Sequence, residues 1–340
     1  MRLNLNLNDT FKRFLNTSLK AFKQLHKNKG YKPEDLKKEK AYRNLIKGTY
    51  DILNLGIKDN DMPEKMQRAL QSDAFLFGGL KANAQLFEAS QLLLNEDGTI
   101  KPYKELAGEF DRLNVLYNQT YLEAEYQFAI NSSEMASKWS ELGTSERYSL
   151  QYRTADDTRV RDTHKSLHNV TLPKEDPFWN SFYPPNGWRC RCTVVEVLKD
   201  KYEASESDKS IKAGEKATTE IGKDGKNRLE IFRFNPGKEQ KLMPPKHPYN
   251  KVKGVKEIKS IIDRYDGVGF KSIKTKNNGE LQIYTSGKQN PQEEKKNKKA
   301  FEILANNGGR YRMLPVIEDG KKNPDGINLK TNHLVDVKVS

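Results

Sequence analysis

Hydrophobic positions recur every three or four residues through much of the first half of the chain. Between residues 65 and about 150, two stretches show this spacing, MQRALQSDAFLFGGLKANAQLFEASQLLL and FDRLNVLYNQTYLEAEYQFAINSSEMASKW. This period places the apolar side chains on one face of an α-helix. The intervening NEDGTIKPY contains the Asp-Gly and Pro typical of a turn. We therefore expect two or three long helices within a helical N-terminal arm, residues 1–150.

The pattern changes after residue 150. RTADDTRVRDTHKSLH is interpreted as largely helical, and CTVVEVL, which ends at Leu198, as a strand. Together they predict a small α+β core spanning residues 151–249. Within it, residues 200–227 are polar and short of large apolar side chains, which favours an extended insertion or a flexible excursion.

A third pattern begins near residue 250. It predicts a short helix, two strands joined by the Asn-Asn-Gly turn of residues 277–279, and a lysine-rich helix from 291 to about 306. Gly308 and Gly309 are a typical C-terminal stop for that helix. The expected fold class is therefore a multidomain α+β protein, with a helical arm, a small α+β core and a C-terminal α/β domain, residues 250–340.

Composition agrees with several compact domains joined by polar segments, because hydrophobic residues make up 35% and charged residues 31% of the 340 positions. The sequence has no run of eighteen apolar residues and no apolar signal-peptide core at its N-terminus. We expect a soluble protein made in the host cytoplasm, with no membrane partner. The formal net charge of +14 indicates attraction to polyanions, either nucleic acid or an acidic protein surface. Well-solvated lysine-rich helices are the alternative interpretation.

Four candidate metal ligands lie within about forty residues: His164, His168, Cys190 and Cys192. Imidazole and thiolate are the ligands that tetrahedral Zn²⁺ prefers, and His164 and His168 share a face if their segment is helical. His168 is alternatively a surface or capping residue. The cysteines are alternatively small apolar residues packed in a core, or half of a catalytic Cys-His pair, although no orienting group can be identified. A disulfide between cysteines two residues apart would close a strained ring.

The order of these residues resembles phage minor head proteins of the Mu F-like family. The resemblance depends on Arg153-Thr154, His164, Pro184-Pro185 and Cys190-Arg191-Cys192, followed by FNPGKEQKLMPPKHPY at residues 234–249. Many relatives begin with Cys-x-x-Cys where this chain has Asp156, Asp157 and His164. The resemblance implies a virion protein inside the capsid near the portal. Its implied partners are the portal protein, contacted by the helical arm, other head proteins and packaged DNA.

A second group of chemically suggestive residues lies at the C-terminus. Pro324-Asp325 is followed, after ten residues, by Asp336-Val337-Lys338. Two carboxylates can hold Mg²⁺ beside a phosphodiester, and a lysine can orient the attacking water. On a strand Asp336 and Lys338 would point to one side, while Val335, Val337 and Val339 pack inward.

This arrangement resembles the PD-(D/E)xK nucleases, in particular tRNase toxin domains of contact-dependent inhibition proteins, over about residues 265–340. The resemblance implies a Mg²⁺-dependent endonuclease toxin delivered through the Mu F-like module, with Asp325, Asp336 and Lys338 as catalytic residues and an immunity protein as partner. The implied substrate is tRNA, with DNA as the alternative. Glu294 shares a helix face with Phe301 and is a further candidate ligand. Related cores continue beyond the lysine, so we expect an incomplete core here. The alternatives are a charged edge strand with Asp325 in a turn, or a chromosomal nucleic-acid-binding protein unrelated to phage.

Overall fold

The computed structural model describes residues 5–143, 146–265, 270–284, 291–313, 325–331 and 333–338. The chain divides into two compact units, Met1–Lys259 and Ser260–Ser340. The predicted helical arm and the predicted α+β core thus lie within the same compact unit. In the described part of the chain, no helix is both long and apolar enough to cross a bilayer.

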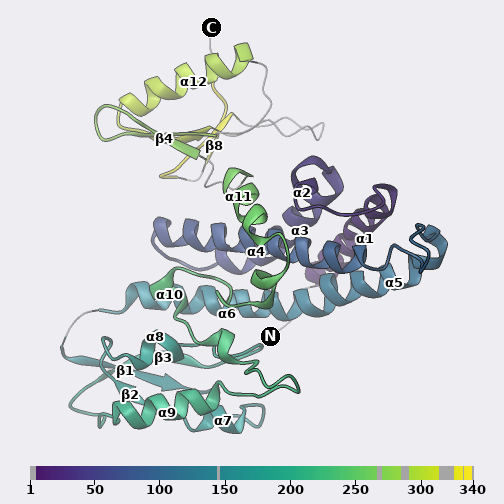
Figure 1. Cartoon of the computed structure of the whole chain (residues 1–340). Helices are drawn as coiled ribbons and strands as arrows, with labels where there is room; N and C mark the ends of the chain where they lie inside the picture. The colour runs from purple at the N-terminus through teal and green to yellow at the C-terminus, as the bar shows by residue number, and fades with distance from the viewer. Residues whose placement is uncertain are drawn as a thin grey trace. The chain divides into compact units, whose positions relative to one another are not determined.

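Long helices build one layer of the first unit (Figure 1). In the first of them, Phe11, Phe14, Phe22 and Leu25 recur at helical spacing and are buried. A Cβ atom added at Gly56 would lie 3.0 Å from the backbone nitrogen of Ile130, so the helices that carry these residues approach closely. The helices are α1 (Leu5–Lys27), α2 (Asp35–Lys38), α3 (Lys40–Lys58), α4 (Glu64–Ser90), α5 (Tyr103–Val115) and α6 (Leu122–Glu141).

A π-helical turn, Leu116–Tyr121, joins α5 to α6 without a break in the helix. Its i→i+5 hydrogen bonds widen the turn and change which side chains face the neighbouring helices. Tyr117 and Asn118 are directed towards α4: the Tyr117 hydroxyl donates to Glu88 Oε2 at 2.6 Å, and Asn118 Nδ2 donates to Gln85 Oε1 at 2.7 Å. Residues 103–141 therefore form one long rod that contacts α4 through the π turn.

The second layer of this unit is a three-stranded antiparallel sheet with order β2-β1-β3. Leu150 pairs with Leu172, and Arg153 pairs with Thr193. Tyr152, Trp179 and Tyr183 are completely buried at the centre of its core. The elements are β1 (Tyr148–Arg153), α7 (Asp162–Lys165), β2 (Thr171–Leu172), α8 (Phe178–Phe182), β3 (Thr193–Leu198), α9 (Ser207–Ala217), η2 (Glu230–Phe232), α10 (Pro236–Glu239) and η3 (Pro248–Lys251).

The prediction that residues 200–227 form an extended or flexible insertion is wrong, because α9 forms within this segment. Small residues rather than large ones make its contacts. A Cβ atom at Gly214 would lie 2.5 Å from the ring of Phe182, so α9 and α8 pack face to face only because this position is glycine. Ala217 is buried beside it, and Ile211 packs against the same core.

The chain then returns to the helical layer through residues 234–249, which we call the return segment (Figure 1). Asp73 of α4 accepts hydrogen bonds from the backbone nitrogens of Leu242 at 2.9 Å and Met243 at 3.0 Å. At its end, the Tyr249 hydroxyl donates to Glu125 Oε1 at 3.1 Å. Two buried carboxylates on α4 and α6 thus hold this polar, proline-rich segment against the helices.

Glu125 also pairs with Lys81, whose side chain is completely buried. Burial lowers the pKa of Lys81 and raises the pKa of Glu125, since a low-dielectric site disfavours both charged forms. The ring of His247 meets the ring of Tyr249 edge-on, with centroids 4.2 Å apart, and burial lowers the pKa of His247 to about 3. The return segment therefore ends in a closely packed polar cluster.

The second unit contains a five-stranded mixed sheet with order β4-β5-β6-β7-β8. As predicted, a tight turn with Asn277 and Asn278 at positive φ joins the first two strands, and Gly308 at φ 85° follows the lysine-rich helix. That helix is the crossover between the parallel strands β5 and β6 and packs through Phe301 and Ala305. The elements are β4 (Phe270–Lys274), β5 (Glu280–Tyr284), α12 (Pro291–Asn306), β6 (Arg310–Met313), β7 (Gly326–Asn328) and β8 (Leu334–Val335), preceded by α11 (Val255–Tyr265).

Candidate metal centre and carboxylate site

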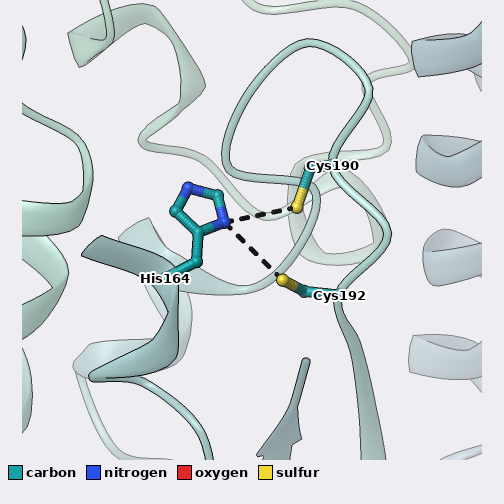
Figure 2. Close-up of side chains that lie close together, drawn as sticks. All are labelled: His164, Cys190 and Cys192. Carbon is teal, nitrogen blue, oxygen red and sulfur yellow. Dashed lines mark hydrogen bonds between the residues drawn. The ribbon is translucent and has the colours of Figure 1, made fainter. Parts of the chain in front are cut away.

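Three of the four predicted zinc ligands meet in the α+β core (Figure 2). His164 Nδ1 lies 3.8 Å from Cys190 Sγ and 3.6 Å from Cys192 Sγ. All three side chains are buried, and their ligand atoms lie within 4.8 Å of one another. Both cysteines are free thiols. The predicted approach of His164 to the Cys-Arg-Cys segment is therefore confirmed.

Local structure explains how these residues meet. His164 lies on the single turn of α7, and the cysteines lie immediately before β3, whose pairing with β1 fixes the end of their loop. Asn131 of α6 donates to the carbonyl oxygen of Cys190 at 2.6 Å. Cys190 and Cys192 direct their sulfurs to one side, whereas Arg191 reaches Asp157 on the other, with two nitrogen–oxygen distances of 2.6 Å.

Each of the two thiols shifts the pKa of the other. The pKa of Cys190 lies well below its ordinary value because it accepts a hydrogen bond from Cys192 and lies beside His164. The pKa of Cys192 is raised by its bond to ionised Cys190 and by burial. His164 Nδ1 faces both sulfurs and is therefore the ring atom that could share a ligand with them. His164 Nε2 is buried and has no hydrogen-bond partner among the described residues. Soft sulfurs and one imidazole are a donor set suited to Zn²⁺.

The structure does not bring His168 into this group. Helix α7 ends at Lys165, so the expected helical face does not extend to His168. Its Nδ1 instead accepts a hydrogen bond from the backbone nitrogen of Thr154 at 3.2 Å and lies 2.8 Å from the Thr154 hydroxyl. His168 thus positions the end of β1.

Asp157 is a site residue whose role the sequence did not reveal. Its contact with Arg191 ties its loop to the cysteine loop. The guanidinium of Arg191 holds the pKa of Asp157 well below its ordinary value. The sequence around Asp157 does not indicate that its partner is Arg191, more than thirty positions away.

In the second unit, Asp325 lies beside the Asp-Val-Lys segment. Its Oδ2 accepts a hydrogen bond from the backbone nitrogen of Val337 at 2.8 Å, and its Oδ1 accepts one from Asn297 Nδ2 at 2.9 Å. Asp336 and Lys338 are exposed, whereas Val335 and Val337 pack inward on the core, as the alternation predicted. Pro324 and Val339 lie outside the described residues.

Glu294 lies one helical turn before Asn297 on α12, which places it on the helix face that meets Asp325. Among the described residues, Glu294, Asp325 and Asp336 do not form a group of three ligands comparable to the Cys-His cluster. Asn297 was missed by the sequence interpretation because an asparagine within a run of lysines resembles a solvated helix position. Its side chain is in fact buried.

Comparison with known proteins locates the first site within a recognised family. Residues 95–195 match the family described as "Phage Mu protein F like protein". The chain is 32% identical over 108 residues to "Putative capsid assembly protein F" of Escherichia phage Mu, covering 31% of this chain and 22% of that protein. It is 42% identical over 50 residues to "Mu-like prophage FluMu F protein" of Haemophilus influenzae, covering 15% of this chain and 12% of that protein.

No solved structure matches the chain significantly. The aligned segments span less than a quarter of the length of either relative. The matched region begins before α5, continues through the π turn, α6 and β1, and includes His164, Cys190 and Cys192. Residues 95–195, which include the first site, are therefore similar to the Phage Mu F-like family.

Proposed function

We propose that this chain is a phage head assembly protein located inside the capsid near the portal, with the portal protein and other head proteins as partners. The supporting observation is the similarity of the segment around the Cys-His cluster to a capsid assembly protein. The helices α1–α6 would provide the portal-contacting surface. The α+β core would be the part that a bound metal holds together.

Fractionation of particles tests this proposal. Proheads and mature particles made by the phage genome that encodes this chain are purified and probed for the full-length chain. We expect the chain to cosediment with proheads and with isolated portal, whereas an abundant host protein of similar size remains in the soluble fraction. A chain found only in the soluble fraction would contradict a role in the particle.

A structural Zn²⁺ held by His164 Nδ1 and the sulfurs of Cys190 and Cys192 is part of the same proposal. Zinc bonds of ordinary length at tetrahedral angles place nitrogen and sulfur ligands about 3.6 Å apart. The two nitrogen–sulfur distances here are 3.6 and 3.8 Å, so the residues fit the ion. When bound, Zn²⁺ would stabilise both cysteines as thiolates, which the pair cannot achieve alone.

The contacts of Asp325 favour a second function for the C-terminal unit, phosphodiester cleavage of RNA or DNA. Its bond to Val337 holds a carboxylate beside the two residues, Asp336 and Lys338, that would act with it. Carboxylate oxygens are suitable ligands for Mg²⁺, and each oxygen of Asp325 keeps acceptor capacity beyond its hydrogen bond. Bound Mg²⁺ would stabilise charge on the phosphate. Lys338 would orient water, and Asn297 would keep Asp325 in position.

Substitution of the exposed pair tests the nuclease proposal. For Asp336→Asn and for Lys338→Met we expect Mg²⁺-dependent cleavage of tRNA or duplex DNA to fall by about 100-fold or more, a typical effect of removing a transition-state contact. Lys276→Met, at an exposed position of the same unit, removes an equal charge and should keep full activity. Gel assays with labelled substrates measure the rates. Equal rates in all variants and the parent would exclude these residues from any cleavage.

A further inference from the structure

Four arginines surround the mouth of the Cys-His cluster. A small cavity of about 20 Å³ opens there, and its lining consists of Ala155, Arg159, Val160, Arg161, His164, Arg189, Cys190, Arg191 and Cys192. Arginines alternate with the candidate metal ligands along the chain. Arg189 and Arg191 flank Cys190, and Arg161 immediately precedes the helical turn of His164. Any change in the position of the ligands therefore moves the guanidinium groups.

Two of these arginines are held in place by neighbouring groups. Arg161 Nη2 donates to the carbonyl oxygen of Trp188 at 2.7 Å, and Arg191 binds both oxygens of Asp157. A held guanidinium loses less conformational freedom when it takes up a ligand. Arg161 and Arg191 thus line the cavity in positions that are fixed before a ligand binds.

The positive charge of the other two arginines is less neutralised by neighbouring groups. Arg189 is exposed and makes no hydrogen bond or ion pair within the described part of the chain. Its backbone adopts φ 59°, a left-handed conformation that is unfavourable for a residue other than glycine and that occurs at ligand-binding turns. Arg159 is 77% exposed and contacts Asp157 only at 3.4 Å. Among the residues that line the cavity, the four arginines carry positive charge and no carboxylate is present.

We propose that this arginine-lined cavity binds a backbone phosphate of nucleic acid, and that metal at the Cys-His cluster maintains the arrangement that binds it. Guanidinium forks match the paired oxygens of a phosphate. The phosphate would lie at the mouth of the small cavity, where all four arginines are exposed to solvent. The chain's net charge of +14 gives the attraction that brings a polyanion to the site. The metal-dependent part rests on the proposed zinc site, whereas the phosphate contact does not.

Binding of a labelled 20-base-pair duplex to the zinc-loaded full-length chain tests the proposal by fluorescence anisotropy. The double variant Arg159→Gln/Arg189→Gln changes no metal ligand. We expect its Kd to rise at least tenfold, and the slope of log Kd against log salt to fall by about 1 to 2, as for the loss of one or two phosphate contacts. The control Lys20→Gln/Lys104→Gln removes the same charge at exposed positions on α1 and α5 and should change Kd less than twofold.

Zinc removal gives a second, independent readout. Chelation should weaken binding by the parent to the level of the arginine variant and should not weaken the variant further. If both double variants lose affinity for the duplex equally, binding depends on the overall charge of the chain and the proposed site is wrong. Binding by the arginine variant as tight as that of the parent would also contradict the site. If the arginine substitutions weaken binding of poly-L-glutamate as much as binding of the duplex, the partner is an acidic protein rather than nucleic acid. Unchanged binding after chelation would overturn the coupling to metal, whatever the particle fractionation shows.

Discussion

Removing zinc from the purified protein is expected to lower the free energy of unfolding of the α+β core by about 4 kcal/mol, the value that linkage gives when free zinc is about 1,000 times its Kd. The cluster is buried, and its two thiols cannot both ionise without a cation. Because protons compete for the sulfurs, zinc should bind more weakly as the pH falls. Calorimetry with and without a chelator measures the loss, and elemental analysis should find one zinc per chain.

Matched variants identify the ligands. Cys192→Ala and His164→Ala should each lose the zinc and unfold at the temperature of the chelated parent. His168→Ala should keep one zinc, since His168 binds Thr154 and lies outside the cluster. If the parent contains no zinc and the chelator does not change its melting temperature, the cysteines are ordinary small core residues and the zinc site is contradicted. Zinc lost on replacing His168 would instead restore the four-ligand site predicted from sequence.

Replacing Lys81 with methionine should destabilise the first unit by about 3–5 kcal/mol, because the carboxylate of Glu125 would remain buried without its cation. The double variant Lys81→Met/Glu125→Leu should recover most of this loss, since neither charge of the pair is then left buried without its partner. Urea unfolding of the parent, both single variants and the double variant completes a thermodynamic cycle.

An exposed ion pair provides the control for this cycle. Lys47 and Asp51 are more than half exposed, and Lys47→Met should change stability by less than about 1 kcal/mol. A single variant at Lys81 no less stable than this control would show that the buried pair contributes nothing. A double variant as unstable as the single one would show that the loss reflects packing rather than an unpaired charge.

The sequence pattern correctly predicted the elements that are determined by residues close together in the chain. Apolar spacing predicted the long helices, and an Asn-Asn-Gly turn predicted the β4–β5 hairpin. The crowding of cysteine and histidine predicted the contact of His164 with the Cys-Arg-Cys segment. The valines around Asp336 predicted which side of the last strand faces the core.

The remaining features depend on contacts between distant residues. Nothing near Asp73 indicates that it will bind backbone nitrogens about 170 positions later, and Lys81 and Glu125 resemble ordinary helix-surface charges. Helix α9 escaped detection because its contacts use Gly214 and Ala217, which carry almost no hydropathy signal. His168 was assigned to the metal because the point at which α7 ends is set by the fold rather than by its own residues.

The π turn within residues 103–141 limits how this rod can change in length. A turn closed by i→i+5 bonds holds one residue more than an α turn, so it sets the rotational phase between α5 and α6. Deleting one residue from Leu116–Tyr121 would return this turn to α-helical winding and leave the phase beyond it nearly unchanged. Deleting one residue within α5 would instead rotate everything beyond by about 100°. Glu125 would then leave Lys81, and Asn131 would leave the cysteine loop. Homologous rods should therefore gain or lose a single residue only at this turn, and whole turns elsewhere.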